Sequence, residues 1–481
     1  MKTLMTPIAA AAFLLAGCAA PAFQQPDISV PSAFKESGQQ AIHIAPDGTR
    51  WQRAAPAEQQ PRGEWWLVFH DAALTALIQE ASDNNASLAV AAARVQQARA
   101  LAGIARADRV PQVGASVGAQ RVLKSPAELA QPPGTPESPH TAYAARLTAS
   151  YEVDLFGRVS SSVAAARGDA EASQASFRSV LLSLQADVAQ IYFRLRATDA
   201  ELDTLAETVR LREENVRVNQ RRFDLGDIGE FDLTRARTEL STTRAEAIGL
   251  QRQRASLEHA LAVLLGKPAA HYTAGASPLL DGALMPAIPA GLPSALLQRR
   301  PDIAAAQHGM EAANARIGVA RAALFPELNL AASAGGVAGN FPSVFKSTGE
   351  SWLLGAALAG PIIDGARYRA GVKRSEAALA ESVAAYRQTV LTAFAEVEDN
   401  LAGLRILDGQ SAEIADAVQS ARRSADLAQK LYDAGRSSYL ELLDAQRNLA
   451  AVERSAVQLR GNRAVTTVAL IRALGGSWDN S

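Results

Sequence analysis

Apolar residues recur every seven positions through one long stretch of the chain. The repeated positions hold Leu181, Val188, Leu195, Leu202, Val209, Val216 and Phe223, and the alternate positions hold Leu184, Ile191 and Leu205. This spacing is typical of a coiled-coil seam. A helix from Ser160 to Phe223 would extend roughly 95 Å at 1.5 Å per residue, which is far longer than an ordinary globular helix.

Four other segments alternate apolar with small or polar residues and predict β-strands. They cover about residues 112–121, 143–153, 327–337 and 351–362. In the first of them Val113, Ala115, Val117 and Ala119 alternate with Gln112, Ser116 and Gln120. Strands with one apolar face over about ten residues suit a transmembrane β-barrel with that face toward lipid. The same alternation fits half-buried strands of a soluble sandwich, so periodicity alone leaves both interpretations open.

Four strands are too few to close a membrane barrel, because such barrels begin at about eight strands. An open sheet edge would also leave backbone hydrogen-bonding groups unpaired in lipid. If the strands enter the membrane, several copies of the chain must therefore share one barrel.

Proline placement divides the chain into two halves. No proline occurs between Pro139 and Pro268 or from Ile362 to the C-terminus, whereas prolines crowd the region from Pro268 to Pro301. Because proline interrupts a helix interior, two long helical tracts joined by a connector are predicted. Beyond the first long helix, we expect helices at about 74–108, 231–265, 367–432 and 440–474.

The two halves also resemble each other in sequence. The segment Gly103–Gly118 matches Gly318–Gly335, with Arg106 over Arg321 and Pro111 over Pro326. Each half therefore reads as helix, strand, strand, long helix, turn and return helix. The predicted organisation is a signal peptide at 1–17, an extended segment at 18–73, a first repeat at 74–266, a proline-rich connector at 267–300 and a second repeat at 301–481, with turns at 224–230 and 433–439.

The N-terminus resembles a bacterial lipoprotein signal. Lys2 precedes a short apolar run, Ile8 to Leu15, and small residues lead to Cys18, the single cysteine of the chain. Such a signal is cut before the cysteine, which is then acylated with groups such as palmitate. Ala19 in place of an aspartate fits sorting to the outer membrane. The alternative is an ordinary secretory signal with an incidental cysteine. With Cys18 lipidated, no thiol remains for a disulfide.

Charge and motif searches exclude several classes of function. Forty-eight basic and 49 acidic residues give a net charge of −1, which argues against nucleic-acid binding. The six histidines show no metal-ligand spacing, and the chain has no Walker loop and no nucleophile elbow. The glycine-rich segment Gly335–Asn340 fits a barrel loop better than a phosphate-binding loop. We therefore expect no enzymatic activity, no cofactor and no metal site.

Two acidic residues, Glu441 and Asp444, follow a glycine turn and share one helix face because they are three residues apart. An earlier stretch, Arg222–Arg237, has nearly the same layout of aromatic residue, aspartate, glycine and acid. A pattern that occurs twice favours an architectural role over a catalytic pair. From spacing alone, the two carboxylates could equally form a solvated helix face.

Several motifs together resemble the TolC superfamily of outer-membrane efflux ducts, in its OprM and NodT lipoprotein branch. They are the segments Leu296–Gln307 and Tyr151–Val159 and the paired turns at Phe223 and Tyr432, with the lipoprotein signal and the internal repeat. The resemblance implies a mostly α-helical fold with a membrane β-barrel. It further implies a homotrimer with a twelve-stranded barrel in the outer membrane, a twelve-helix α-barrel in the periplasm, and a girdle built from the connector.

The implied function is a passive exit duct. A periplasmic adaptor and an inner-membrane pump, of the RND type, would deliver substrates to it. The alternative from another class is a lipid-tethered periplasmic coiled-coil scaffold or adaptor with soluble strands and no channel.

The resemblance also implies an aperture gate next to the second turn. Leu440 falls on a constricting apolar position, Glu441 and Asp444 on two acidic positions, and Arg447 on a basic position that can bond a neighbour. Three copies would place six carboxylates around the pore, and such a ring favours cations.

A network behind the gate is implied by the same match. Tyr432 falls on an aromatic position that ties the inner helix pair to the outer pair, and Asp232 on a carboxylate in that network. The family's basic partner falls on Ser437, with Arg436 beside it, so pairing of Asp232 with Arg436 stays open.

Two turn glycines, Gly226 and Gly435, match the tips on which the adaptor docks. A helix that ends in a tight turn would need glycine there for its own reasons.

Overall fold

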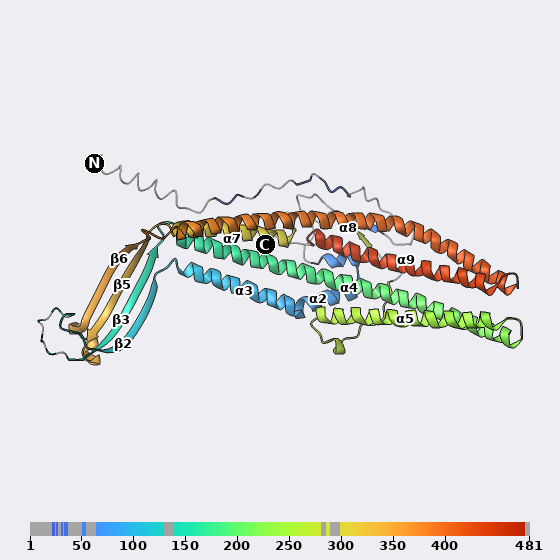
Figure 1. Cartoon of the computed structure of the whole chain (residues 1–481), viewed down its shortest axis with the longest axis horizontal. Coiled ribbons are helices and arrows are strands. Elements are labelled where there is room, and N and C mark those ends of the chain that lie inside the picture. Colours follow the sequence, from blue (N-terminus) through green and yellow to red (C-terminus); the bar gives the residue numbers. More distant parts are fainter. Residues whose placement is uncertain are drawn as a thin grey trace. The chain divides into compact units, whose positions relative to one another are not determined.

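The computed structural model describes residues 22–24, 26, 30–31, 33–36, 51–53, 64–128, 130, 132, 134, 136, 138–279, 285–288 and 299–476. Figure 1 shows the chain, with its helices and strands labelled. The predicted signal peptide, Cys18, most of the segment 18–73 and part of the connector lie outside the described residues.

Long helices dominate the described chain, in two sets of matching length. Helices α4 (Arg158–Asp224) and α8 (Arg367–Asp433) have 67 residues each, and α5 (Glu230–Leu264) and α9 (Tyr439–Ala473) have 35 residues each. At 1.5 Å per residue, α4 and α8 are each about 100 Å long. The shorter helices are α2 (Ala72–Asn84), α3 (Ala86–Ala107) and α7 (Pro301–Ala322). These matching lengths are the structural form of the internal repeat.

The predicted single helix at 74–108 is wrong, because Asn85 divides it. The Asn85 backbone is extended, at φ −71° and ψ 123°. Its side-chain oxygen accepts the amide N–H of Leu88 (3.1 Å), and its side-chain nitrogen donates to the carbonyl of Leu264 at the end of α5 (2.9 Å). Asparagine often begins a helix in this way, because its side chain satisfies an amide that has no helical partner. Residue 85 therefore ends α2, caps α3 and holds the end of α5.

Within the described residues, four strands form one antiparallel sheet in the order β2-β3-β5-β6. They are β2 (Gln112–Val122), β3 (His140–Val153), β5 (Glu327–Ala338) and β6 (Glu350–Ala359). The register pairs Val117 with Ala145, Tyr151 with Leu330, and Leu330 with Ala356. Two short strands, β1 (Trp51–Arg53) and β4 (Met285–Ala287), pair in parallel as a separate sheet.

Large apolar side chains of the four-stranded sheet are exposed in the single chain. Val113, Val117, Trp352 and Leu354 each keep between 71% and 75% of their surface exposed. Soluble monomers rarely leave such a patch uncovered, so another apolar phase or another copy is expected to cover it. No described helix has the length and apolar character needed to cross a bilayer.

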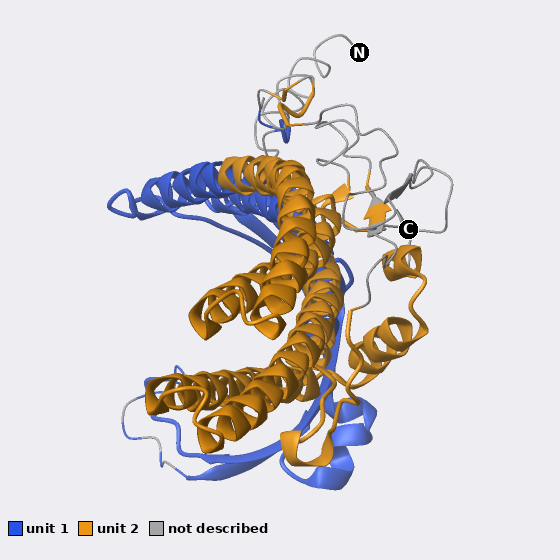
Figure 2. Cartoon of the chain, turned by 90° about the vertical axis from the view of Figure 1, so that its right-hand side faces the viewer, with its two compact units in different colours: residues 1–27, 94–174, 305–386 blue, residues 28–93, 175–304, 387–481 orange. Residues whose placement is uncertain are grey.

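The chain divides into two compact units that cut across the two repeats, coloured separately in Figure 2. The first unit holds residues 1–27, 94–174 and 305–386, and it contains the four-stranded sheet. The second unit holds residues 28–93, 175–304 and 387–481, and it contains both interhelical turns. Each unit therefore takes segments from both halves of the sequence.

The core of the second unit forms around the short 3-10 helix Trp65–Phe69. Trp65, Trp66 and Phe69 pack with Phe193 of α4 and Val468 of α9 in one buried cluster. This packing joins the segment that precedes α2 to helices from both repeats.

Arg300 fastens the end of the connector to two long helices. Its guanidinium donates to Glu396 of α8 (2.7 Å), to the backbone oxygen of Ala473 in α9 (2.9 Å) and to Asp302 (2.7 Å). The arginine side chain is only 9% exposed. The Arg-Arg-Pro-Asp part of the Leu296–Gln307 motif therefore acts as a structural tie within the second unit.

Replacing Arg300 with alanine is expected to lower the free energy of unfolding by about 2–3 kcal/mol. Hydrogen bonds to charged groups are worth about 1.5–3 kcal/mol each. The net loss is smaller than their sum, because the two carboxylates left behind are each about one third exposed and regain water. Thermal unfolding in detergent, followed by circular dichroism, measures the change. Arg387→Ala removes an exposed arginine from α8 as a control; equal midpoints for the two variants would contradict the tie.

Candidate aperture gate

The two long helices end in the same kind of turn. The turn glycines have positive φ angles, +81° at Gly226 and +68° at Gly435, which residues with a side chain rarely adopt. In each turn the glycine amide donates to the carbonyl three residues back, and the next amide donates to the carbonyl five residues back. The four bonds are Gly226 to Phe223 (2.9 Å), Asp227 to Arg222 (2.8 Å), Gly435 to Tyr432 (3.0 Å) and Arg436 to Leu431 (2.8 Å). This pattern is the Schellman motif, so chain geometry alone requires both glycines.

Helix α9 begins with a capping box that involves Glu441. The Ser438 hydroxyl accepts the Glu441 amide (3.4 Å), and the Glu441 carboxylate accepts the Ser438 amide (3.3 Å). A serine followed three residues later by a glutamate, as in Ser438 and Glu441, is the sequence pattern of a capping box. Glu441 therefore stabilises the start of α9 as well as lying at a predicted gate position.

All four predicted gate residues lie on the exposed side of the first turns of α9. Leu440, Glu441, Asp444 and Arg447 are exposed, with Leu440 at 41%. The opposite side packs into the protein, where Leu442 and Leu443 join Tyr432, Tyr439 and Ala236 in a buried cluster.

Arg447 connects α9 to α5. Its Nε donates to Glu239 Oε2 (3.0 Å), and its Nη2 donates to the other carboxylate oxygen. Glu239 is largely buried, with 12% of its side chain exposed, whereas Arg447 is half exposed. The hydrogen bonds from Arg447 hold the pKa of Glu239 below its ordinary value. Asp444 makes a longer contact with Arg447 (3.6 Å).

Sequence reasoning missed Glu239, although the repeat carried a signal for it. Glu239 and Arg447 are 208 residues apart, and the two turn glycines are 435 − 226 = 209 apart. Arg454 bonds Glu246 (2.9 Å), also across 208 residues. Oppositely charged residues about 208 positions apart therefore indicate contacts between corresponding turns of α5 and α9, the return helices of the two repeats.

A buried polar layer joins α9 to α4 through Gln446, the residue directly before Arg447. Arg212 and Asn215 of α4 donate to the side-chain oxygen of Gln446, at 2.7 and 2.9 Å. Arg212 is 2% exposed, and this burial lowers its pKa. Arg212 therefore needs the Gln446 oxygen as a hydrogen-bond acceptor, because a buried guanidinium without an acceptor is costly.

Tyr432 contacts α4 through two residues that the sequence did not single out. Its hydroxyl donates to Asn219 of α4 (3.2 Å), and the guanidinium of Arg222 lies 4.9 Å from the centre of its ring. Tyr439 lies beside it, with ring centres 6.0 Å apart, and burial raises the pKa of Tyr439 to about 12.

Asp232 and Arg436 do not complete this network. Asp232 is half-buried and Arg436 is exposed in the turn. Among the described residues, no hydrogen bond or ion pair joins their side chains.

Comparison with known proteins agrees with this architecture. A family model described as outer membrane efflux protein matches residues 77–267 and 292–476. The probable efflux pump outer membrane protein TtgC of Pseudomonas putida is 36% identical over 481 residues, covering 99% of this chain and 96% of TtgC.

Solved structures are similar over almost the whole chain. A membrane protein from Pseudomonas aeruginosa has a TM-score of 0.84 and 31% identity, covering 96% of this chain and 99% of that one. The MtrE outer membrane channel of Neisseria gonorrhoeae, in its open state, has a TM-score of 0.81 and 29% identity, covering 96% and 98%. The chain therefore belongs to the outer membrane efflux protein family, the TolC-like exit ducts through which efflux systems discharge substrates across the outer membrane.

Proposed function

We propose that three copies of this chain form one channel. Strands β2 and β6 border the four-stranded sheet, so each can pair with the neighbouring copy, and three sheets would close a barrel of twelve strands. The exposed apolar side chains Val113, Val117, Trp352 and Leu354 would then face lipid. The α-helices of three copies would continue the duct through the periplasm.

The duct receives its substrates from two partners. A periplasmic adaptor docks on the turns at Gly226 and Gly435, and an inner-membrane pump of the RND type drives transport. Acylation of Cys18 adds a lipid anchor. The duct conducts passively and needs no catalytic group or cofactor of its own, because the pump supplies the energy.

The start of α9 forms the periplasmic gate of this duct. Leu440, Glu441 and Asp444 project toward the pore, and the carboxylates of three copies favour the entry of cations. The observation that carries this proposal is the salt bridge from Arg447 to Glu239, because it holds the first turns of α9, which carry the gate residues, against α5. Opening then requires α9 to separate from α5 and from the polar layer on α4.

The oligomer test uses the full-length protein extracted in detergent. Light scattering with subtraction of the detergent mass is expected to give the mass of three chains, and the same particles are expected to conduct ions in planar bilayers. A Cys18→Ser variant should keep both properties, because the closed barrel and not the acyl chain would hold it in the membrane. A soluble monomer without conductance would instead favour a lipid-tethered scaffold.

A further inference from the structure

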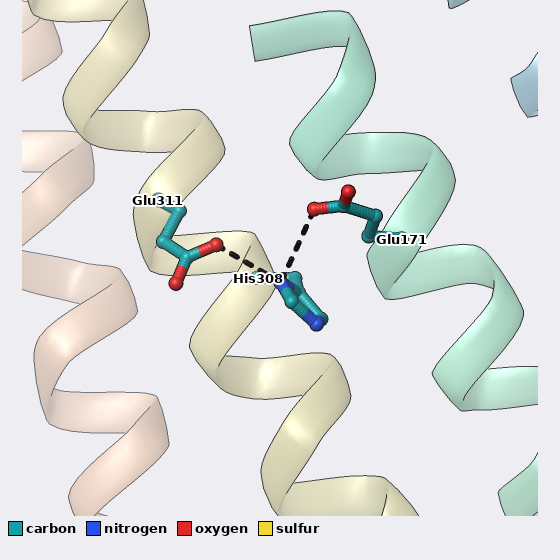
Figure 3. A group of neighbouring side chains, drawn as sticks. All are labelled: Glu171, His308 and Glu311. Atoms are coloured by element: carbon teal, nitrogen blue, oxygen red, sulfur yellow. Dashed lines mark hydrogen bonds and ion pairs between the residues drawn. The ribbon is translucent and has the colours of Figure 1, made fainter. Parts of the chain in front are cut away.

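Three side chains of types that can ligate a metal ion lie together in the first compact unit, whereas the gate residues belong to the second. Glu171 projects from α4, and His308 and Glu311 project from α7 toward it, as Figure 3 shows. One ligand atom from each residue lies within 4.8 Å of the other two. His308 Nδ1 is 2.9 Å from a Glu311 carboxylate oxygen and 3.5 Å from a Glu171 oxygen. The three side chains are each about one third exposed, so an ion could reach them from solvent.

We propose that Glu171, His308 and Glu311 bind one divalent transition-metal ion of the zinc type per chain. Imidazole nitrogen and carboxylate oxygen are both ordinary ligands of Zn²⁺, and an open zinc site has three protein ligands with water in the fourth position. Ligand atoms around a tetrahedral ion at about 2.0–2.1 Å lie about 3.3 Å apart. The observed 2.9 and 3.5 Å from His308 lie on either side of this value, and the two carboxylates lie within 4.8 Å of each other, so rotation of the glutamate side chains toward each other would complete the site.

The two helices are already held together at this level. Gly168, one turn before Glu171, faces Ala312, and a Cβ added at Gly168 would lie 3.0 Å from the Ala312 Cβ. Asp169 forms an ion pair with Arg316 on the next turn of α7. The ligands therefore project from two closely packed helices, and little backbone order has to form when the ion binds.

The charges around the cluster still favour a cation. Arg167 Nε donates to the Glu171 oxygen Oε1 (2.8 Å), and Gln307 donates to Glu311 (3.4 Å). The two carboxylates and the guanidinium together carry a net charge of −1. The hydrogen bond from Gln307 can orient the Glu311 carboxylate, as outer partners do in metal sites. Arg167 is 74% exposed and can turn away when an ion binds.

The test titrates full-length untagged protein, stripped with a chelator, with ZnCl₂ in detergent. Equilibrium dialysis with metal analysis is expected to give a tight site of one Zn²⁺ per chain. His308→Ala and Glu311→Gln are expected to weaken that site by at least about 10- to 100-fold, since losing only an outer partner of a ligand already has that effect. His259→Ala removes an exposed histidine from α5 and should bind like the parent protein.

A second measurement separates a metal site from a simple hydrogen-bonded link between helices. Arg167→Gln removes the positive charge beside Glu171, so Zn²⁺ should bind more tightly to it. Zn²⁺ should also raise the thermal midpoint of the parent protein but not of His308→Ala. Binding that is equal in the parent and His308→Ala, or weaker in Arg167→Gln, would overturn the proposal. Circular dichroism of each variant confirms that it is folded.

Discussion

Replacing Arg447 with alanine is expected to open the channel. The variant loses the bidentate salt bridge from Arg447 on α9 to Glu239 on α5. The Arg447 side of this salt bridge is half exposed to solvent. A pair of this exposure is worth about 0.5–1 kcal/mol. If three chains open together, the sum is about 1.5–3 kcal/mol, which corresponds to an increase of roughly tenfold to hundredfold in the ratio of open to closed channels. Conductance in planar bilayers measures the change.

Glu239→Gln separates loss of the bond from a change of pore charge. Both substitutions remove the ion pair, although the glutamine oxygen can still accept one hydrogen bond from Arg447. Both should therefore raise conductance, while they change the local charge in opposite directions. The double variant should exceed neither single variant by much, because the partners act as a unit. Arg210→Ala removes an exposed arginine that pairs with Glu207 on its own helix, and it serves as the charge control. Unchanged conductance in both Arg447→Ala and Glu239→Gln would refute the gate assignment.

The effect of pH on this bond follows from the pKa of Glu239. Because Arg447 lowers that pKa in the folded protein, the bond contributes fully above the ordinary pKa of a glutamate. Its contribution is lost as the pH falls through the lowered value, which means below about pH 4. Titration of Glu239 should therefore leave conductance constant from about pH 5 to 8 and increase it only in stronger acid.

The structure changes the expected effect of the two acidic residues that first indicated a gate. From the sequence, Glu441→Ala with Asp444→Ala should loosen the aperture and raise conductance. Glu441 bonds the backbone of its own helix start, and Asp444 contacts Arg447 only at 3.6 Å. Within one chain, the double substitution removes a helix cap rather than a bond between helices. We therefore expect a smaller rise in conductance from it than from Arg447→Ala.

Apolar periodicity predicted the long helices because their burial follows it over much of their length. At the seam positions Val188, Leu195 and Leu205, no more than 3% of the residue is exposed. In the part of α4 nearer the Gly226 turn, the polar residues Arg212 and Asn219 are buried instead. Phe223, which belongs to the apolar heptad series, is 38% exposed there. A search for apolar repeats cannot find such a polar layer, because its partners lie on helices more than 200 residues away.

The proposed metal site escaped the sequence for the same reason. His308 and Glu311 have a spacing that places both on one face of α7, but a pair with this spacing is common and carries little information alone. The third ligand, Glu171, comes from α4, and only the packing of Gly168 against Ala312 brings it near. Turn glycines are easier to predict, because the requirement for positive φ is local.

Gly336→Ala is expected to prevent the four-stranded sheet from forming normally. Gly335 and Gly336 lie both in the predicted strand at about 327–337 and in the glycine-rich segment expected to form a barrel loop, and the structure places both in strand β5 (Glu327–Ala338). A Cβ added at Gly336 would lie 1.8 Å from the carbonyl oxygen of Val344, and one at Gly335 would lie 2.0 Å from that of Ala145. Neither obstacle is a flexible side chain that could rotate away, so the backbone itself would have to move. The cost is about 3 kcal/mol, at the upper end for overpacked sites.

The measurement is the yield of channels that can be extracted from outer membranes in detergent and that conduct ions. Gly118→Ala in β2 is the matched control, because an added Cβ there has no atom within 4 Å. Both variants place alanine in a strand of the same sheet, so strand propensity changes alike and only the close backbone approach differs. If the sheet requires the close approach of Gly336 to the Val344 carbonyl, Gly336→Ala loses most of the channel yield and Gly118→Ala keeps it. Equal yields would mean that the segment Phe341–Phe345, which carries Val344, can shift without disturbing the sheet.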